Sequence, residues 1–389
     1  MAPMPRSGAA EIEFVDTTDI FTFGWTGHCE RLVLRPPMVP PPQLPAWSNI
    51  SLPDIIVQEH EGYLALPPTI AAYAITDALL IDSGFVYCDN RLVYLRDCFP
   101  DYWGIPLESG ELVSSIGILK PDAWMKRREI RVDMPVSCPI HQNMIYGHFL
   151  LEMLPRAAGL ASLRRQGARF AVALPSTLSD WAKTILGIYF DPLEIIWFNP
   201  NTDVVVAPSI ILTSMMHCSY NFHPELGEVV HELLGRLGAP TTMKSDGSGC
   251  ASDRRIFISR SRVWHDVRLI NAEKIEATAQ DLGFEIVHPQ EMSFAEQVRL
   301  FHEARVVMGE AGSALHNVLF SQPGTRVISL NMFSWYQSAI GRLRQLPHAF
   351  IAPEDGHFRH WRMLEGRYRI YAINPSDVRL AFQAMCGDL

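Results

Sequence analysis

Residues 306–317 read Val306-Val307-Met308-Gly309-Glu310-Ala311-Gly312-Ser313-Ala314-Leu315-His316-Asn317, and this run decides the fold of the second half of the chain. It begins with apolar residues typical of a buried strand, passes through a turn of small residues and continues as a helix. Such a junction brings backbone N–H groups to a helix N-terminus, where an anion can bind. A tight turn without a ligand would contain the same small residues. The run therefore predicts an α/β unit with a candidate ligand edge.

Strands and helices alternate on both sides of this run. Strands are predicted at residues 255–259, 284–288, 304–308 and 326–330, with helices at 272–282 and 312–320. Ser293 and Glu296 form a capping box that begins a further helix, because each side chain satisfies a backbone amide of the other residue. Right-handed crossovers turn this progression into a doubly wound parallel sheet, whose ligands bind beyond the carboxyl ends of the strands.

Changes in composition predict four segments along the chain. The proline cluster at residues 36–42 cannot form a helix or a central strand, so residues 1–54 are interpreted as a proline-rich arm or connector. Residues 55–238 carry short strand-like runs and then alternating strands and helices, which predict a first α/β domain. Residues 239–253 lack periodicity and are interpreted as a linker. Residues 254–389 form the second domain, whose last helix packs either there or back on the first domain.

The composition excludes several classes of protein. With 389 residues, of which 48% are apolar and 19% charged, the chain is long enough for two or three globular domains. A net charge of −9 lacks the basic excess that nucleic-acid binding requires. No run of apolar residues is long enough to predict a membrane span, and residues 1–10 lack an apolar signal core. A cytoplasmic location is therefore expected.

Neither a metal nor a cofactor is expected. The seven cysteines are scattered and form no Cys-x-x-Cys pair, and most of them are expected to be small buried side chains. The sequence has no Asp-x-Asp pair, the usual holder of a divalent ion on a nucleotide diphosphate. It also lacks the fingerprints of P-loop enzymes, dinucleotide oxidoreductases and α/β-hydrolases.

Two arginines follow the first strand of the second domain. Ser259-Arg260-Ser261-Arg262 places two guanidinium groups at the sheet edge where the small-residue turn also lies. Arginine binds phosphate through two hydrogen bonds, so these side chains suit an anion held by the helix amides. A solvated basic loop is the alternative. The coincidence of both features at one edge favours a nucleotide diphosphate site.

A histidine and a glutamate share one helix face in the first domain. In the stretch from Tyr146 to Arg156, His148 and Glu152 are four residues apart. An imidazole and a carboxylate suit general-base chemistry on a hydroxyl group, with the carboxylate either taking the proton or orienting the ring. An ordinary exposed pair on a helix would have the same spacing. Pro155 is expected to bend or end the helix and to turn Arg156 in a new direction.

Together these motifs resemble a known family. The segments Gly147–Arg156, Ile256–Ser261, Gly283–Pro289, Ser293–Gln297 and Gly309–Asn317 occur in the order found in glycosyltransferase family 61. The resemblance covers residues from about 140 to about 330. It implies an α/β protein of the GT-B fold, in which two Rossmann-like, doubly wound domains face each other across a cleft. It also implies inverting, metal-independent transfer of a sugar from a nucleotide diphosphate donor.

The resemblance further implies a set of site residues. Glu152 and His148 would act on the acceptor, with Arg156 and His141 on the acceptor side. The expected donor-site residues are Ser259, Arg260, Arg262, His288, Pro289, Gly309, Glu310, Gly312, Ser313, Ala314, Leu315, His316 and Asn317. Within this set, Arg260 would bind the diphosphate, the backbone from Gly312 to Leu315 would cap it, and His288 with Pro289 would lie beside the base.

The small-residue turn departs from the family pattern at two positions. Many relatives read Gly-x-His-Gly-Ala-Gly, whereas Ala311 stands here at the histidine position and Ala314 replaces the last glycine. Glu310 is a candidate substitute that would bind a ribose or sugar hydroxyl. The expected mechanism is a single displacement, in which Glu152 takes a proton from the acceptor while Arg260 and the helix amides stabilise the leaving diphosphate.

The expected function is that of a hexosyl- or pentosyltransferase in surface or capsular polysaccharide synthesis. Its partners would be a nucleotide-sugar donor, with UDP as the first choice of nucleotide, and a glycan or glycolipid acceptor. Acceptors on lipid carriers would bring it to the inner face of the membrane as a peripheral protein. Two other classes stay open: a non-catalytic nucleotide-sugar or glycan-binding protein, and a nucleotide-sugar epimerase of the GT-B type. No oligomeric state is predicted.

Overall fold

The computed structural model divides the chain into two compact units. The first comprises Met1–Val39 and Leu66–Ser219, and the second comprises Pro40–Ala65 and Tyr220–Leu389. The residues whose structure is described are 12–14, 21–22, 29–38, 46–51, 69–82, 84–88, 91–95, 98, 126–140, 145–218, 221–239, 253–263, 268–331, 335–356 and 370–387. Most of the expected linker, residues 240–252, lies outside them.

A parallel sheet forms the centre of the second unit. Its described strands, in spatial order, are β18 (Glu285–Val287), β17 (Arg255–Ile258), β19 (Val306–Glu310), β20 (Arg326–Leu330), β21 (His348–Ile351) and β4 (Trp47–Ser48). Every adjacent pair runs parallel. The four strands predicted from the sequence are confirmed, although β19 begins and ends two residues later than expected.

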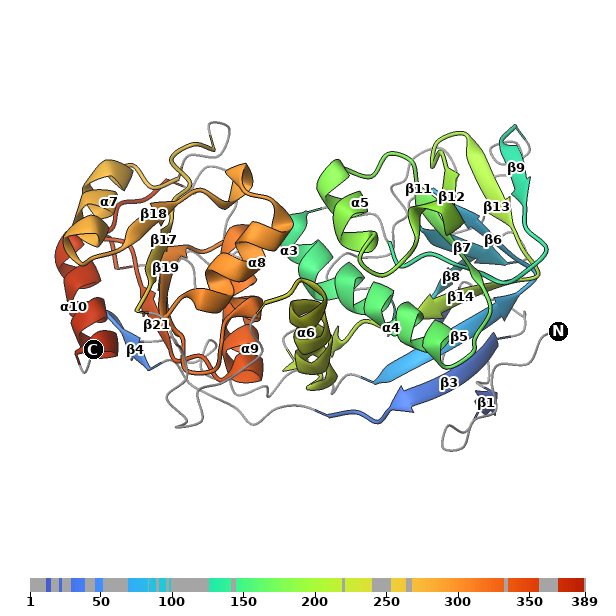
Figure 1. The fold of residues 1–389 in the computed structure, drawn as a ribbon, viewed down its shortest axis with the longest axis horizontal. Coiled ribbons are helices and arrows are strands. Elements are labelled where there is room, and N and C mark those ends of the chain that lie inside the picture. The colour runs from blue at the N-terminus through green and yellow to red at the C-terminus, as the bar shows by residue number, and fades with distance from the viewer. Residues whose placement is uncertain are drawn as a thin grey trace. The chain divides into compact units, whose positions relative to one another are not determined.

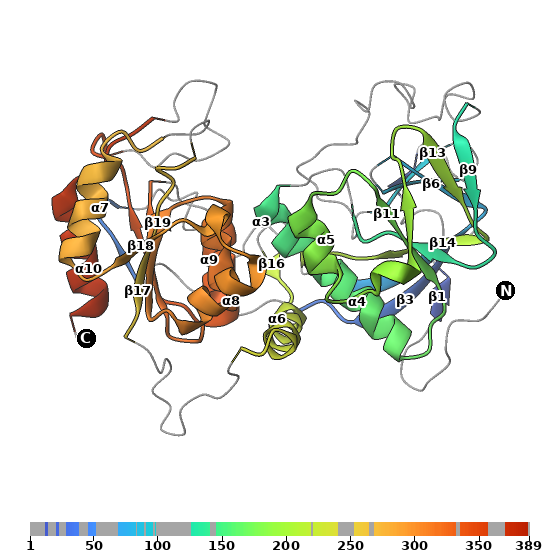
Figure 2. The same ribbon diagram turned by 45° about the horizontal axis from the view of Figure 1, so that its top comes forward.

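Helices cover both faces of this sheet. Figures 1 and 2 show α7 (Ala272–Asp281) and α10 (Pro375–Cys386) on one face and α8 (Phe294–Glu303) and α9 (Trp335–Arg344) on the other. The 3₁₀-helix η6 (Ser313–Phe320) contacts α8 and α9, and α6 (Glu225–Arg236) contacts η6 in turn. The capping box of Ser293 and Glu296 begins α8 as predicted.

The last helix packs within the second unit. Val378, Ala381 and Met385 of α10 are buried in an apolar core that includes Ile275 of α7 and Ile328 of β20. These three positions lie on one side of α10, because helix residues three, four and seven apart share a face. The alternative in which the last helix packs back on the first domain is therefore wrong.

Part of the proline-rich N-terminal region is a strand of the second unit. β4 pairs in parallel with β21, at the edge of the sheet. Asn49 then fixes this segment, because its Nδ2 donates to Asp377 Oδ2 at 2.8 Å and its Oδ1 accepts from the Ala352 N–H at 2.7 Å. The interpretation of residues 1–54 as an arm missed this strand, since two residues are too short to show a period of two.

The described residues of the first unit form two sheets. The larger contains, in spatial order, β1 (Ile12–Phe14), β3 (Cys29–Arg35), β5 (Ile70–Thr76), β14 (Ser209–Thr213), β10 (Val136–Ser137), β11 (Ala171–Pro175) and β12 (Ile195–Phe198). The smaller contains β2 (Phe21–Thr22), β8 (Arg91–Tyr94), β7 (Phe85–Cys88), β6 (Ala78–Ile81), β13 (Asp203–Val206) and β9 (Arg128–Arg131). The helices are α3 (Tyr146–His148), η3 (Phe149–Met153), α4 (Leu154–Arg165), α5 (Asp180–Leu186) and η4 (Pro192–Glu194).

This first unit is a mixed α/β domain, in which parallel and antiparallel strands share one sheet. In the larger sheet β14, β10, β11 and β12 run parallel, whereas β1, β3 and β5 run antiparallel to their neighbours. Tight turns replace helical crossovers in this part of the chain. Asp82 and Gly84 adopt positive φ angles of 51° and 98° between β6 and β7, which pair antiparallel. None of the described helices combines the length and apolar character that a membrane crossing requires.

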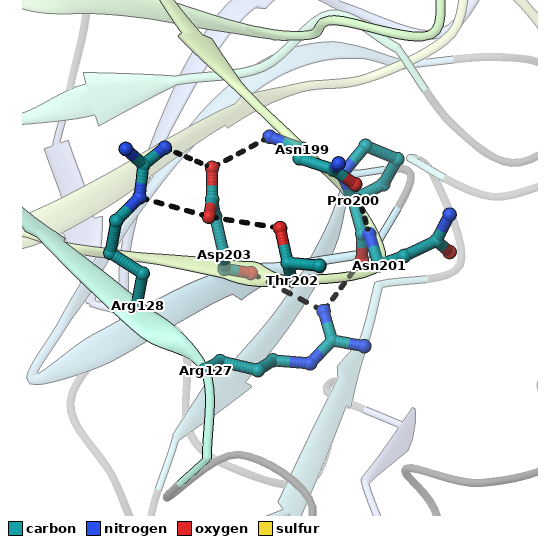
Figure 3. A network of polar contacts seen from close by, with 7 residues as sticks. All are labelled: Arg127, Arg128, Asn199, Pro200, Asn201, Thr202 and Asp203. Atoms are coloured by element: carbon teal, nitrogen blue, oxygen red, sulfur yellow. Dashed lines mark hydrogen bonds and ion pairs between the residues drawn. The ribbon is translucent and has the colours of Figure 1, made fainter.

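Asp203, the first residue of β13, ties two strands of the smaller sheet together (Figure 3). Its buried carboxylate accepts hydrogen bonds from Arg128 Nε at 3.1 Å, from Arg128 Nη2 at 2.6 Å and from the Asn199 N–H at 2.8 Å. Arg128 begins β9, so the ion pair lies where the parallel pairing of β9 with β13 starts. The hydrogen bond from Arg128 holds the pKa of the Asp203 carboxyl below its usual range.

We expect Asp203→Asn to destabilise the first unit at neutral pH and to reduce the further loss of stability as the pH falls. Because the folded pKa lies below the unfolded value of about 3.9, the carboxylate stabilises the fold above that pH. The contribution is lost as the pH falls through the folded pKa. At neutral pH the variant should lose about 1–2 kcal/mol, since solvent screens the exposed side of the Arg128 pair.

Urea unfolding at neutral pH and near pH 3 measures both effects. Asp133→Asn, at an exposed aspartate in the same region, is the matched control and should change neither. Equal acid sensitivity in the wild type and Asp203→Asn would contradict the prediction.

Candidate functional site

One helix carries the candidate acid–base residues of the first unit. It runs from α3 through η3 into α4, and η3 is a π-helical turn in which the Leu154 N–H donates to Phe149 O, five residues earlier. Pro155 has no N–H, and in an α-helix its ring would crowd the carbonyl of Leu151. The wider turn relieves this conflict. The expectation that Pro155 ends the helix is therefore wrong, because the helix continues to Arg165.

His148 and Glu152 are in direct contact on this helix. His148 Nδ1 lies 2.6 Å from Glu152 Oε1, and His217 of β15 (His217–Cys218) brings its Nε2 to 3.8 Å from the same oxygen. Glu152 has no exposed surface, whereas 21% of the His148 side chain is exposed. The interpretation as an ordinary exposed pair is wrong, because the carboxylate lies in the core.

Arg156 continues the same helix into the interior of the unit. The residue is 1% exposed, and its Nη2 donates to Cys138 O at 3.5 Å. Burial lowers the pKa of the guanidinium, while Cys98, Cys138 and Glu152 act in the opposite direction. Arg156 lies one residue after Pro155, in a helix that continues past the proline. Arg156 places a positive charge near the Glu152 carboxylate.

Aromatic packing fixes the start of this helix. The Trp181 ring of α5 meets the rings of Tyr146 and Phe149 edge-on, with centroids 5.4 Å and 5.0 Å apart. Edge-to-face pairs of this kind stabilise one orientation in addition to burying apolar surface. His148 lies between these two anchored residues in the sequence and is therefore held in register with Glu152. His141 lies outside the described residues.

The second unit presents a candidate ligand edge at the carboxyl ends of β17 and β19. From β17 the chain crosses to β18 on one side, and from β19 it continues to β20 on the other, so these two strands flank a topological switch point. Ligands of open α/β sheets bind at such points. Residues 259–262 follow β17 and residues 311–314 follow β19, so the fold brings two predicted motifs to one place.

Two glycines allow close approach at this edge. A β-carbon on Gly309 would lie 2.7 Å from Ile258 Cβ, so any side chain here would force β17 and β19 apart. A β-carbon on Gly312 would lie 3.2 Å from Arg260 Nη1. The Arg260 guanidinium therefore lies against the turn that precedes η6.

Ser259 holds the loop that carries Arg260. Its buried hydroxyl donates to Glu276 Oε1 of α7 at 2.6 Å and lies 2.8 Å from Ser261 Oγ. The Ser261 N–H also donates to Ser259 Oγ at 3.0 Å. These hydrogen bonds fix the backbone on both sides of Arg260, so the role that the structure gives Ser259 is to shape the loop.

Two backbone N–H groups precede the first hydrogen bond of η6. The first hydrogen bond of the helix runs from the Leu315 N–H to Gly312 O at 3.0 Å, so the amides of Ser313 and Ala314 precede it. The Leu315 N–H is used within the helix. Gly312, Ser313 and Ala314 are half-buried, whereas the later residues of η6 are buried.

Later predicted residues of η6 make packing contacts. Asn317 Nδ2 donates to Gln297 Oε1 of α8 at 2.8 Å, and both side chains are buried. The His316 ring lies 5.7 Å from the Tyr336 ring of α9, centroid to centroid. These contacts hold η6 against the two neighbouring helices and so fix the position of its first turn.

The remaining predicted donor residues lie at the end of β18. His288 follows this strand, and Pro289 begins the short helix η5 (Pro289–Glu291) as a buried residue. Arg262 Nη1 donates to Glu291 Oε2 at 2.7 Å and holds the pKa of that carboxyl below its usual range. In the part of the chain that the structure describes, no group of three or more His, Cys, Asp or Glu side chains is placed to hold a metal ion.

Two residues contact the predicted sites although no motif in the sequence links them to those sites. His217 approaches Glu152, and the Tyr371 hydroxyl donates to Glu310 Oε2 at 2.6 Å. Each contact joins segments that are far apart in the sequence, so the spacing of residues within a motif could not reveal it. Glu310, which was expected to bind a donor hydroxyl, has this oxygen engaged by Tyr371.

The segment that carries both candidate sites matches a family of known proteins. The family model described as Glycosyltransferase 61 matches residues 146–328. The matched segment begins at the helix of His148 and Glu152 and ends within β20, so it contains the switch-point edge as well. No curated protein matches the chain. The resemblance predicted from the motifs is confirmed.

We expect Gly309→Ala to destabilise the second unit by about 1–3 kcal/mol, the usual cost of overpacking a filled interior. The new β-carbon would meet Ile258 where β17 and β19 pair. Gly159→Ala in α4 is the matched control, because its β-carbon would meet no described atom within 4 Å. The control should be neutral or stabilising, since alanine favours a helix interior. Thermal unfolding compares the variants, and equal stability of both would refute the close approach at Gly309.

Proposed function

We propose, from the membership of residues 146–328 in glycosyltransferase family 61, that the chain moves a sugar from a nucleotide diphosphate donor to a hydroxyl group of a glycan or glycolipid. The observation that carries the proposal is the contact between the partly exposed His148 ring and the buried Glu152 carboxylate, inside the matched segment. A UDP-sugar is the first donor to test, and the transfer inverts the anomeric carbon.

His148 is the proposed general base. Glu152 Oε1 holds the ring at Nδ1, so the proton of the acceptor hydroxyl would pass to Nε2. The sequence favoured Glu152 itself as the base, but a carboxylate without exposed surface reaches no acceptor in this arrangement. In this proposal Glu152 orients the ring and stabilises the imidazolium that forms when the ring takes the proton.

Arg260 and the amides of Ser313 and Ala314 are the proposed donor contacts. The acceptor oxygen attacks the anomeric carbon while the bond from that carbon to the diphosphate oxygen breaks, and a single displacement inverts the configuration. Negative charge grows on the diphosphate as this bond breaks. In this scheme the guanidinium and the backbone N–H groups stabilise that charge without a metal ion.

The proposal extends to the organisation of the enzyme. In it, the first unit is the acceptor-binding domain and the second unit the donor-binding domain of a GT-B transferase. The product is part of a surface or capsular polysaccharide, by analogy with the family. A lipid-linked acceptor would bring the enzyme to the inner face of the membrane as a peripheral protein.

We expect one nucleoside diphosphate to stabilise the protein in the presence of EDTA. A ligand that binds only the native state adds about 2.7 kcal/mol at 100 times its dissociation constant. A thermal-shift screen of UDP, GDP, CDP and ADP measures this effect. Arg260→Ala should abolish the shift. Arg262→Ala, in the same loop but paired with Glu291, is the matched control and should keep most of it. A screen without any shift would count against the donor site.

We expect His148→Ala to lower kcat for sugar transfer by on the order of 10²-fold or more, because it removes the general base. Glu152→Gln should lower kcat by a smaller factor, since the ring stays but loses the charge that orients it. Neither variant should change the shift caused by the nucleoside diphosphate. Transfer assays with the matching nucleotide sugar measure both rates. Wild-type transfer by His148→Ala, with none by Glu152→Gln, would make Glu152 the base.

A further inference from the structure

A buried hydrogen bond joins the last residue of β19 to the C-terminal part of the chain. Glu310 and Tyr371 are 7% and 4% exposed, and the Tyr371 hydroxyl donates to Glu310 Oε2 at 2.6 Å. Glu310 lies on the same face of β19 as Met308, because strand residues two apart share a face. Met308 and Tyr371 belong to one apolar core. The carboxylate is thus held at the edge of that core, next to the small-residue turn.

Tyr371 is fixed independently of Glu310. Its N–H donates to Arg268 O, and its carbonyl accepts from the Ile270 N–H, both at 2.9 Å. These bonds form a parallel bridge between Tyr371 and Leu269. The phenol therefore reaches Glu310 from an anchored backbone, and the hydrogen bond holds the carboxylate in one orientation.

Two arginines act on the same pair. Burial raises the pKa of Tyr371 well above its ordinary value, and the charge and hydrogen bond of Glu310 raise it further, whereas Arg268 and Arg260 act in the opposite direction. The phenol therefore stays protonated at neutral pH and remains a donor. Arg260 is also the side chain that lies against Gly312. The charge of Arg260 thus acts on the phenol that donates to Glu310 at the end of β19.

Without the hydrogen bond from Tyr371, Glu310 would compete with a donor diphosphate for Arg260. Each is an anion that a guanidinium can bind through two parallel hydrogen bonds. A carboxylate close to a diphosphate also repels it. Tyr371 opposes both effects, because its hydrogen bond engages Oε2 and draws the negative charge toward the phenol. Phenylalanine at this position would remove that hydrogen bond and leave more of the charge to act on Arg260.

We propose that Tyr371 is a positioning residue of the donor site: by holding Glu310 Oε2, it limits the grip of Glu310 on Arg260 and leaves the guanidinium for the donor diphosphate. This inference rests on the proposed function, because it concerns the proposed diphosphate contact. Tyr371 touches no substrate in this scheme. Its effect passes through Glu310 and Arg260. Tyr371 should therefore change the affinity for the donor and not the rate of the reaction at the acceptor.

A double-mutant cycle on Tyr371 and Glu310 tests the inference. Calorimetry gives the dissociation constant of UDP for the wild type, Tyr371→Phe, Glu310→Gln and the double variant, with GDP, CDP and ADP as further probes. We expect Tyr371→Phe to weaken binding by on the order of tenfold. Glu310→Gln should bind as tightly as the wild type or more tightly. The double variant should bind like Glu310→Gln, because the charge that Tyr371 restrains is gone.

Steady-state kinetics adds a readout that a general loss of structure would not give. Tyr371→Phe should raise the KM for the donor by the same factor, while kcat and the KM for the acceptor stay near wild type. Tyr87→Phe removes a buried phenol from the first unit and is the matched control. Tyr87→Phe should leave kcat and the KM values for donor and acceptor unchanged.

Three results would overturn the inference. These are wild-type binding by Tyr371→Phe, weaker binding by Glu310→Gln than by the wild type, and a double variant that stays as weak as Tyr371→Phe. Failure of the proposed function looks different. In that case the wild type and Arg260→Ala would bind none of the four nucleoside diphosphates, and the role of Tyr371 would fall together with the donor site.

Discussion

A buried carboxylate is stable only where hydrogen-bond donors or positive charges surround it, and each half of the chain has one such group at its candidate site. In the first unit, Glu152 lies in the core with the His148 ring 2.6 Å away and His217 and Arg156 nearby. In the second unit, Glu310 accepts from Tyr371 at the end of β19. A shift of either carboxylate would leave a charge without its partners. The partners that each buried carboxylate requires therefore also fix the side chains at each candidate site.

Irregular backbone places both carboxylates. The π-helical turn at residues 149–153 carries the helix past Pro155, so Glu152 and Arg156 stay on one continuous helix. In the second unit, Gly309 allows β19 to approach Ile258 so closely that Glu310 and the following turn lie beside the loop of Arg260. π-Helical turns and close glycine contacts both recur at functional sites, because they place groups that regular elements cannot.

The family match and the unit boundaries divide the chain in different ways. Residues 146–328 begin in the middle of the first unit and end within β20 of the second, so each unit contributes one of the two candidate sites. The N-terminal region outside the match supplies β4 to the second sheet and most of the antiparallel strands to the first unit. The matched segment therefore shares both units with residues that the family model does not cover.

Local patterns in the sequence were sufficient for part of each unit. In the second unit, apolar periodicity located four strands of the sheet, and the capping box of Ser293 and Glu296 located the start of α8. In the first unit, spacing paired His148 with Glu152. Each of these features depends on residues within a few positions of one another. In the first unit the sequence left the strand order open, and the turn at Asp82 and Gly84 makes β6 and β7 antiparallel.

The sequence by itself determined the parallel sheet of the second unit, the family of the matched segment and the residues from which both sites are built. The tertiary structure decided what each residue does there. It buried Glu152 and left the His148 ring partly exposed, kept the helix intact through Pro155, and brought Tyr371 to Glu310. The physical reason is that burial and contacts between distant segments arise only when the elements pack, whereas periodicity and spacing are already properties of the unfolded chain.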